Sequence, residues 1–173
     1  MTLIPRPEPG EYHDYYGRYI ARVPGDDALT GLSLTPPPLV ARLADLDPVR
    51  GVYRYAPEKW TVCGVLQHVI DTERVFAYRA LRFARADRTP LPGYDEEKWA
   101  PYTEVERRTV DDLLAEFSVV RAASRALMRS LPPAAVTRSG VANDAEISVR
   151  ALAWIILGHE LHHLAILRER YHV

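Results

Sequence analysis

Apolar residues recur at three- and four-residue spacing along residues 62–85, and this period is typical of a helix that buries one face. The stripe consists of Val62, Val65, Leu66, Val69, Ile70, Phe76, Ala77, Ala80 and Leu81. Thr61 precedes it and can act as the N-cap. The pattern predicts an amphipathic helix of about six turns.

Similar patterns predict further helices along the chain. Thr109 can cap a helix over residues 110–131 that ends at Pro132, and Ser148 can cap one over residues 149–171. Shorter helices are predicted at residues 11–22 and 39–45. No stretch alternates with the period of two that a half-buried strand needs. The sequence therefore predicts an all-α fold, a single domain over residues 1–173.

The charge composition of the chain argues against nucleic acid and membranes as binding partners. The 22 Lys and Arg residues nearly balance the 23 Asp and Glu residues, so the net charge of -1 gives no field that would attract nucleic acid or an anionic membrane. The N-terminal residues lack the features of a signal peptide, and no apolar run is long enough to span a bilayer. We expect a cytoplasmic protein. Its one cysteine, Cys63, is expected to be a buried free thiol without a catalytic role.

The histidines carry the candidate chemistry. At about 100° per residue, His159 and His163 project from the same apolar side of the last helix, whereas His162 points about 100° away from His163. Four-residue spacing lets one helix offer two ligands to a single ion. His68, at the edge of the apolar stripe of the strongest helix, is the natural third ligand.

An alternative is that these histidines are core residues satisfied by hydrogen bonds. Two imidazoles that face each other in an apolar bundle would find few partners, and protonating both would cost like-charge repulsion. These costs favour a bound metal ion over the alternative.

Residues 159–163 also match the H-E-x-x-H pattern of zinc proteases. The longer form of that pattern requires a glycine where Ile166 stands, and no further ligand follows. The sequence also predicts no strand that could bind an extended peptide. A protease is therefore the less favoured interpretation.

Several motifs of the chain occur together in one known family. They are Lys59-Trp60-Thr61, Leu66-Gln67-His68-Val69-Ile70-Asp71-Thr72-Glu73-Arg74, Arg79-Ala80-Leu81-Arg82-Phe83-Ala84-Arg85, Pro90-Leu91-Pro92-Gly93-Tyr94-Asp95 and Gly158-His159-Glu160-Leu161-His162-His163. In these motifs the sequence resembles the DinB/YfiT-like family of metal-binding four-helix bundles. The resemblance covers nearly the whole chain. It implies a bundle with crossover connections, preceded here by a short N-terminal helical extension, and a frequent homodimer. It also assigns the metal ligands to His68, His159 and His163.

The resemblance implies a metal-dependent enzyme that transfers a low-molecular-weight thiol, such as bacillithiol, to a small electrophile. Two alternatives stay open: a hydrolase that uses metal-activated water, and a non-catalytic, metal-stabilised dimerisation module. Zinc or nickel is the expected ion, with manganese or iron as alternatives, since all accept imidazole ligands.

Two acidic residues lie on apolar helix faces, where each needs a partner. For Glu73 we expect an internal ion pair with Arg74, Arg79, Arg82 or Arg150, and for Glu160 a catalytic role as a proton-transfer group or in support of the ligands. Trp60, Tyr94 and Trp99 are expected to be core or loop anchors. The loop with Tyr94, Asp95 and Trp99 is the best candidate for a wall of the pocket.

Overall fold

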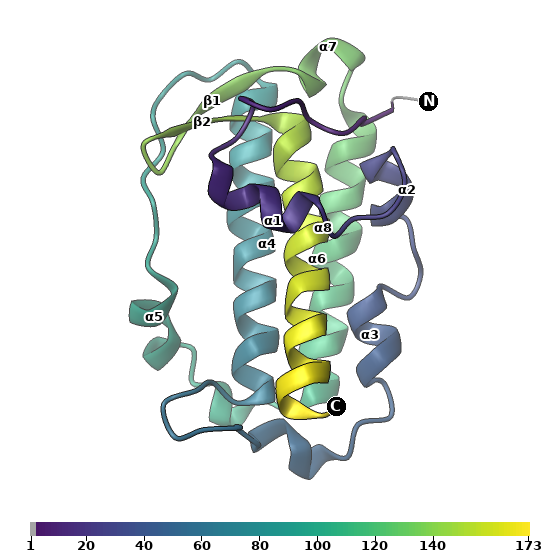
Figure 1. Ribbon diagram of the computed structural model, residues 1–173, viewed down its shortest axis with the longest axis vertical. Helices are drawn as coiled ribbons and strands as arrows, with labels where there is room; N and C mark the ends of the chain where they lie inside the picture. Colours follow the sequence, from purple (N-terminus) through teal and green to yellow (C-terminus); the bar gives the residue numbers. More distant parts are fainter. Residues whose placement is uncertain (1–2) are drawn as a thin grey trace.

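A computed structural model describes residues 3–173 and shows a helical bundle. Three long helices, α4 (Val62–Ala84), α6 (Val110–Ser130) and α8 (Val149–Ile166), lie side by side (Figure 1). Two short helices, α2 (Ala28–Leu32) and α3 (Pro38–Leu43), both pack on α6 and α8 and together fill the fourth position. The fold is the four-helix bundle that the sequence predicts.

The remaining elements are short. They are η1 (Asp14–Tyr16), α1 (Gly17–Ile20), η2 (Pro48–Val52), α5 (Glu96–Trp99), η3 (Ala100–Tyr102), η4 (Val105–Arg107), α7 (Pro133–Val136), β1 (Ser139–Ala142), β2 (Ala145–Ser148) and the π-helical η5 (Leu167–Tyr171). Among the described helices, none is both long and apolar enough to cross a membrane.

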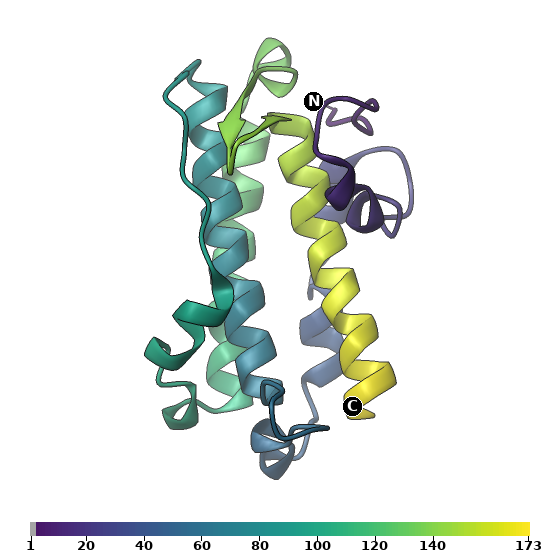
Figure 2. The ribbon, with the colours of Figure 1, turned by 60° about the vertical axis from the view of Figure 1, so that its left-hand side comes forward.

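The helices α4 and α6 run in the same direction, and α8 runs in the opposite one (Figure 1). Parallel neighbours need a connection that returns along the whole bundle. Residues 85–109, which include α5, make this crossover and descend along the outer side of α4 (Figure 2). This connection also forms a wall of the candidate site, which is described below.

The three caps predicted from the sequence are confirmed. The hydroxyl of Thr61 accepts a hydrogen bond from the amide of Gly64 at 3.0 Å, and Thr109 and Ser148 accept equivalent bonds at the starts of α6 and α8. Each bond satisfies an amide that the first helical turn leaves without a partner. The start of each long helix is therefore determined locally.

A small β-hairpin differs from the expectation that no segment forms a strand. Strands β1 and β2 pair antiparallel, with Ser139 opposite Ser148. Asn143 and Asp144 have φ values of 52° and 60° and form the two-residue turn, a conformation that Asn and Asp tolerate well. Four-residue strands are too short for their alternation to be recognised, and the Asn-Asp pair was the signal that could have found them.

The predicted helix over residues 11–22 is shorter in the structure, where η1 and α1 cover residues 14–20. Its first predicted residue, Glu11, serves another element: its carbonyl accepts a hydrogen bond from the amide of Ser148, and its carboxylate pairs with Arg150. This long-range contact holds Glu11 outside the helix.

Two apolar clusters form the core. One contains the C-terminal half of α4 and the N-terminal half of α8, and the other contains the N-terminal halves of α4 and α6 with η5. Between them lies a layer of buried polar side chains, which consists of Thr72, Glu73, Arg121, Ser124, His159 and Glu160. The candidate site is part of this polar layer.

The helix α1 crosses α8 at a close backbone contact (Figure 1). A Cβ atom at Gly158 would lie 2.1 Å from the carbonyl oxygen of Tyr19, far inside van der Waals contact. The contact also holds the Tyr19 ring against the imidazole of His159, with ring centroids 5.4 Å apart. Gly158 therefore allows α1 to cover one side of the histidines.

We predict that Gly158→Ala destabilises the protein by about 1–3 kcal/mol, because the clash with Tyr19 outweighs the higher helix propensity of alanine. Urea unfolding measures the change. Gly17→Ala is the control, since a Cβ there meets only Tyr12 at 3.8 Å. Equal stability of the Gly158 variant and the natural protein would contradict the packing argument.

Candidate metal centre

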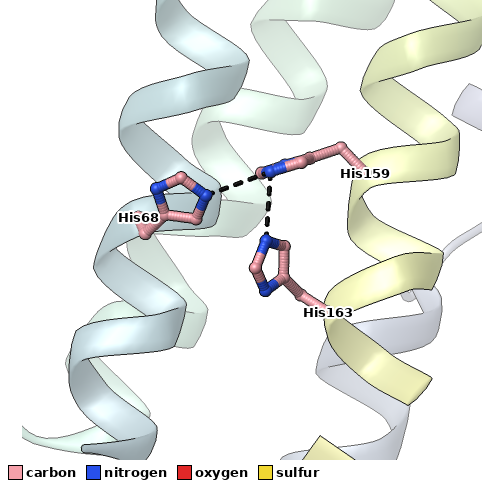
Figure 3. Close-up of side chains that lie close together, drawn as sticks. All are labelled: His68, His159 and His163. Atoms are coloured by element: carbon pink, nitrogen blue, oxygen red, sulfur yellow. Dashed lines mark hydrogen bonds between the residues drawn. The ribbon is translucent and has the colours of Figure 1, made fainter. Parts of the chain in front are cut away.

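Three histidines from two helices converge in the polar layer. His68 comes from α4, and His159 and His163 come from successive turns of α8; their side chains point toward one another (Figure 3). The Nε2 atom of His159 lies 3.1 Å from Nε2 of His68 and 3.1 Å from Nε2 of His163. One ligand atom from each ring falls within 4.8 Å of the others.

These contacts cannot all be hydrogen bonds. A neutral imidazole nitrogen has a single in-plane position, which carries either a proton or a lone pair. Nε2 of His159 can therefore bond one of its two neighbours but not both. Three lone pairs directed at a shared point would satisfy all three rings around one ion, and tetrahedral ligands about 2.05 Å from zinc are roughly 3.3 Å apart. The residues present fit a divalent metal ion.

Burial keeps the three ligands in the neutral form that a metal requires. It lowers the pKa of His68 to about 4 and the pKa values of His159 and His163 well below their ordinary value, and repulsion among the imidazoles acts in the same direction. Proton competition for the ligands is therefore weak near neutral pH.

His162 does not join the cluster, as its position on the helix predicts. Its ring packs against Tyr19, with centroids 5.1 Å apart, rather than facing His68. On the other side of the site, the ring of Trp60 lies 4.9 Å from that of His68. Trp60 thus anchors a ligand by packing.

Glu160 and Glu73 share one buried arginine from α6. The guanidinium of Arg121 donates two hydrogen bonds to Glu73, at 3.0 and 2.9 Å, and one to Glu160, at 2.7 Å. The other oxygen of Glu160 accepts a bond from the amide of Leu39 at the start of α3. Burial alone would lower the pKa of Arg121, but the two carboxylates outweigh it and raise that pKa.

Arg121 corrects the expectation for Glu73. The ion pair is internal, as predicted, but none of the four proposed arginines makes it. Arg74, Arg82 and Arg150 pair instead with Glu116, Asp87 and Glu11, respectively. Sequence spacing shows which face of α4 carries Glu73 but not which helix packs on that face. The partner of Glu73 lies 48 residues away on α6.

Glu160 follows His159 directly, yet neither of its carboxylate oxygens is free. One accepts a hydrogen bond from Arg121, and the other accepts one from the amide of Leu39. A protease of the H-E-x-x-H type needs this glutamate free to act on water at the metal. These contacts argue against a protease. A catalytic role of Glu160 stays a prediction.

Two cavities adjoin the histidines. The larger, of about 420 Å³, reaches His68 and His159, and the other, of about 320 Å³, reaches His68. Tyr94 lines both, and Trp99 lines the smaller one, which confirms that their loop forms a wall of the pocket. Asp95 instead caps α5, where its carboxylate accepts a bond from the amide of Lys98.

The Tyr94 wall is fixed by a polar contact. The hydroxyl of Tyr94 donates to Thr72 on α4 at 2.9 Å, and its ring packs 4.8 Å from that of Trp99. Burial raises the pKa of Tyr94 to about 12, so its hydroxyl keeps its proton. Cys63 is buried as expected, and burial raises the pKa of its thiol as well.

Sequence reasoning missed the other residues that line the larger cavity. Tyr16 and Tyr19 reach it from the N-terminal segment, and Arg79 reaches it from α4. Arg79 follows His68, Thr72 and Phe76 at helical spacing, so the inward stripe of α4 contained this signal. The tyrosines gave no local signal, because they reach the site only through the docking of α1 on α8.

Comparison with known proteins identifies the family. A sequence profile of the DinB superfamily matches residues 32–167. The chain belongs to the DinB superfamily. This DinB-superfamily protein also resembles the solved structure of YfiT from Bacillus subtilis, which is described as a probable metal-dependent hydrolase with an unusual four-helix bundle topology.

The two structures share a TM-score of 0.70 at 19% sequence identity. The match covers 94% of this DinB-superfamily chain and 89% of the YfiT chain. At this identity the likeness establishes the fold. No curated protein sequence matches the chain.

We predict that His68→Ala, His159→Ala and His163→Ala each remove most of the bound metal, because each deletes one of three converging nitrogens. His162→Ala is the matched control and should keep its metal, since that ring lies outside the cluster. Elemental analysis of the four purified variants checks this. Equal loss in all four would contradict the ligand assignment.

We also predict that Arg121→Ala lowers the free energy of unfolding by about 3–5 kcal/mol, because two buried carboxylates lose their partner. Denaturant unfolding at pH 7 provides the measurement. Arg129→Ala, on the exposed side of α6, should change stability by less than about 0.5 kcal/mol. A small effect at Arg121 would show that the network contributes little.

Proposed function

We propose that this DinB-superfamily protein is a metal-dependent hydrolase that acts on a small molecule in the cavity beside His68 and His159. The proposal rests on three converging histidine nitrogens that have no fourth Cys, His, Asp or Glu ligand within residues 3–173. Structural zinc sites usually have four protein ligands, whereas three ligands and an open position are typical of catalysis. This difference favours an enzyme over a metal-stabilised interaction module.

In the proposed hydrolase, the three histidines hold the ion that activates water, and the cavity beside them holds the substrate. Three neutral imidazoles leave a divalent ion its full charge, and such an ion lowers the pKa of a bound water toward neutrality. Burial of the histidines keeps them unprotonated. Tyr94, held by Thr72, bounds the cavity. Zinc or nickel is the ion we propose.

The YfiT comparison also supports hydrolysis, since that protein is described as a probable metal-dependent hydrolase. This support is indirect, because the two chains share a fold and only 19% of their residues. The donor set of this chain is the more direct argument.

Thiol transfer is the second candidate, and one observation favours it. The cluster contains no carboxylate, and both oxygens of Glu160 are already engaged, so the glutamate next to His159 is not free to take a proton from water. A free thiol ionises near pH 8.5, far more easily than water, and needs less help. A low-molecular-weight thiol such as bacillithiol would then be the cosubstrate.

One experiment tests hydrolysis. The protein is stripped with a chelator, reloaded with zinc, nickel, manganese or iron, and tested against a panel of small esters, amides and lactones. We expect hydrolysis that needs metal and a kcat/KM at least about 100-fold lower in His159→Ala, because even residues behind the ligands alter activity 10–100-fold. The control His162→Ala should keep its activity. Hydrolysis that persists without metal would exclude this mechanism.

A parallel experiment decides between water and thiol. The cobalt-loaded protein is titrated with bacillithiol, mycothiol, glutathione and cysteine, and a near-ultraviolet charge-transfer band reports a sulfur ligand. Hydrolysis predicts that the added thiol is not consumed, whether or not it binds the metal. A band, together with consumption of thiol and a small electrophile, would replace hydrolysis with thiol transfer.

A further inference from the structure

Arg79 is a buried cation without a carboxylate partner. Its residue is only 4% exposed, similar to the 3% of Arg121. Arg121 is held by two carboxylates, whereas Arg79 forms no ion pair with any of residues 3–173. Its polar partners are neutral: Nη2 donates a hydrogen bond to the carbonyl oxygen of Pro92 at 2.9 Å, and the guanidinium also interacts with the hydroxyl of Tyr16. A buried charge that lacks a counterion is costly, so this guanidinium calls for an anion.

The charge faces the larger cavity beside the metal centre. Arg79 lines this cavity together with the ligands His68 and His159. Its guanidinium carbon lies 5.6 Å from the ring centre of Phe76 and 5.8 Å from that of Tyr94. These rings are also on the lining, so Arg79 is the cationic end of a cavity with aromatic walls.

The ring of Phe76 sets the distance between the two ends. His68, Thr72, Phe76 and Arg79 are spaced by four, four and three residues and share one face of α4. The guanidinium carbon of Arg79 lies 5.6 Å from the ring centre of Phe76, and that ring centre lies 6.5 Å from the ring centre of His159. The guanidinium is therefore no more than about 12 Å from the ring of His159.

We infer that this cavity binds a small carboxylic acid with an apolar body. Its carboxylate pairs with Arg79 while the group at its other end meets the histidine cluster. This assignment names the substrate class of the proposed hydrolase and rests on that proposal only for the reaction at the second end.

The charge on the lining favours a carboxylate over a phosphate. Arg79 is the one Lys or Arg on the described lining, and a single guanidinium balances a monoanion. A phosphate dianion would need a second cation. The aromatic walls, which include Tyr16 and Phe76, suit a hydrophobic body between the two ends.

Glu96 is the competing partner within the protein. It is the one carboxylate on the described lining, but it is exposed and makes no ion pair with Arg79. Neutralising it should leave Arg79 at least as free to bind an external anion. Glu96→Gln therefore separates an internal pair from a ligand site.

The test uses two metal-binding probes of equal length. Suberic acid monohydroxamate carries a carboxylate at the end opposite its hydroxamate, and octanohydroxamic acid has a methyl group there. Isothermal titration calorimetry on the metal-loaded protein gives both Kd values. We expect the carboxylate probe to bind roughly 10- to 100-fold more tightly, the range of a charge-assisted hydrogen bond to a buried partner.

Variants assign this preference to Arg79. Arg79→Gln should abolish it and leave the affinity for octanohydroxamic acid within about threefold, Arg79→Lys should keep part of it, and Glu96→Gln should keep or increase it. Thermal unfolding and metal content confirm that each variant is folded and loaded. Equal affinity for both probes in the natural protein, a preference that survives Arg79→Gln, or binding of neither probe would overturn the inference.

The outcome is separate from that of the proposed function. A carboxylate preference without hydrolysis would keep the anion site and reject the hydrolase. Hydrolysis without a carboxylate preference would keep the hydrolase and reject the anion site.

Discussion

The position of the three converging histidines depends on one buried guanidinium. Arg121 on α6 holds Glu73 of α4 and Glu160 of α8, and these contacts fix how far each helix is rotated about its axis. Glu160 directly follows His159, and Glu73 lies five residues after His68. On a helix, these separations correspond to rotations of about 100° and about 140°, so each acid points away from that histidine. Locking the acids to α6 therefore directs the imidazoles toward one another.

Forming such a network and breaking it have different energetic consequences. Removing three charged groups from water costs free energy that their attraction offsets only in part. In this chain the network lies between two apolar clusters, at the level where the histidines meet. Glu160 also binds the amide of Leu39, so it ties α3 to the same layer. The short helix α3, which shares the fourth position of the bundle with α2, is thus held next to the polar layer.

The crossover connection covers one side of the polar layer that contains the histidines. Because α4 and α6 are parallel, the chain must return along the bundle, and residues 85–109 make this return beside α4 (Figure 2). Within this connection, Tyr94 bonds Thr72 of α4 and packs on Trp99. On the other side, α1 brings Tyr19 onto His159 through the close contact at Gly158. The bundle brings the three histidines together, while these two coverings and Arg79 shape the cavity that reaches His68 and His159.

Local chemistry along the chain determined much of this structure. Helical periodicity and the hydroxyl caps of Thr61, Thr109 and Ser148 define the three long helices, because those signals act within one or two turns. The i, i+4 spacing of His159 and His163 likewise fixes their shared face before any tertiary contact exists. Family resemblance then pointed to His68 as their partner and to the bundle topology.

Tertiary structure alone decided which groups from distant elements meet. Three features depend on contacts between segments far apart in sequence. Glu73 pairs with Arg121, and Glu11 pairs with Arg150 instead of joining the first helix. Arg79 has no carboxylate partner and bonds the carbonyl of Pro92. The periodicity of a helix predicts which face a residue occupies, but not which other helix packs on that face. The packing of the helices decides which residues become partners across the bundle. The charges that line the cavity could therefore be assigned only from the folded structure.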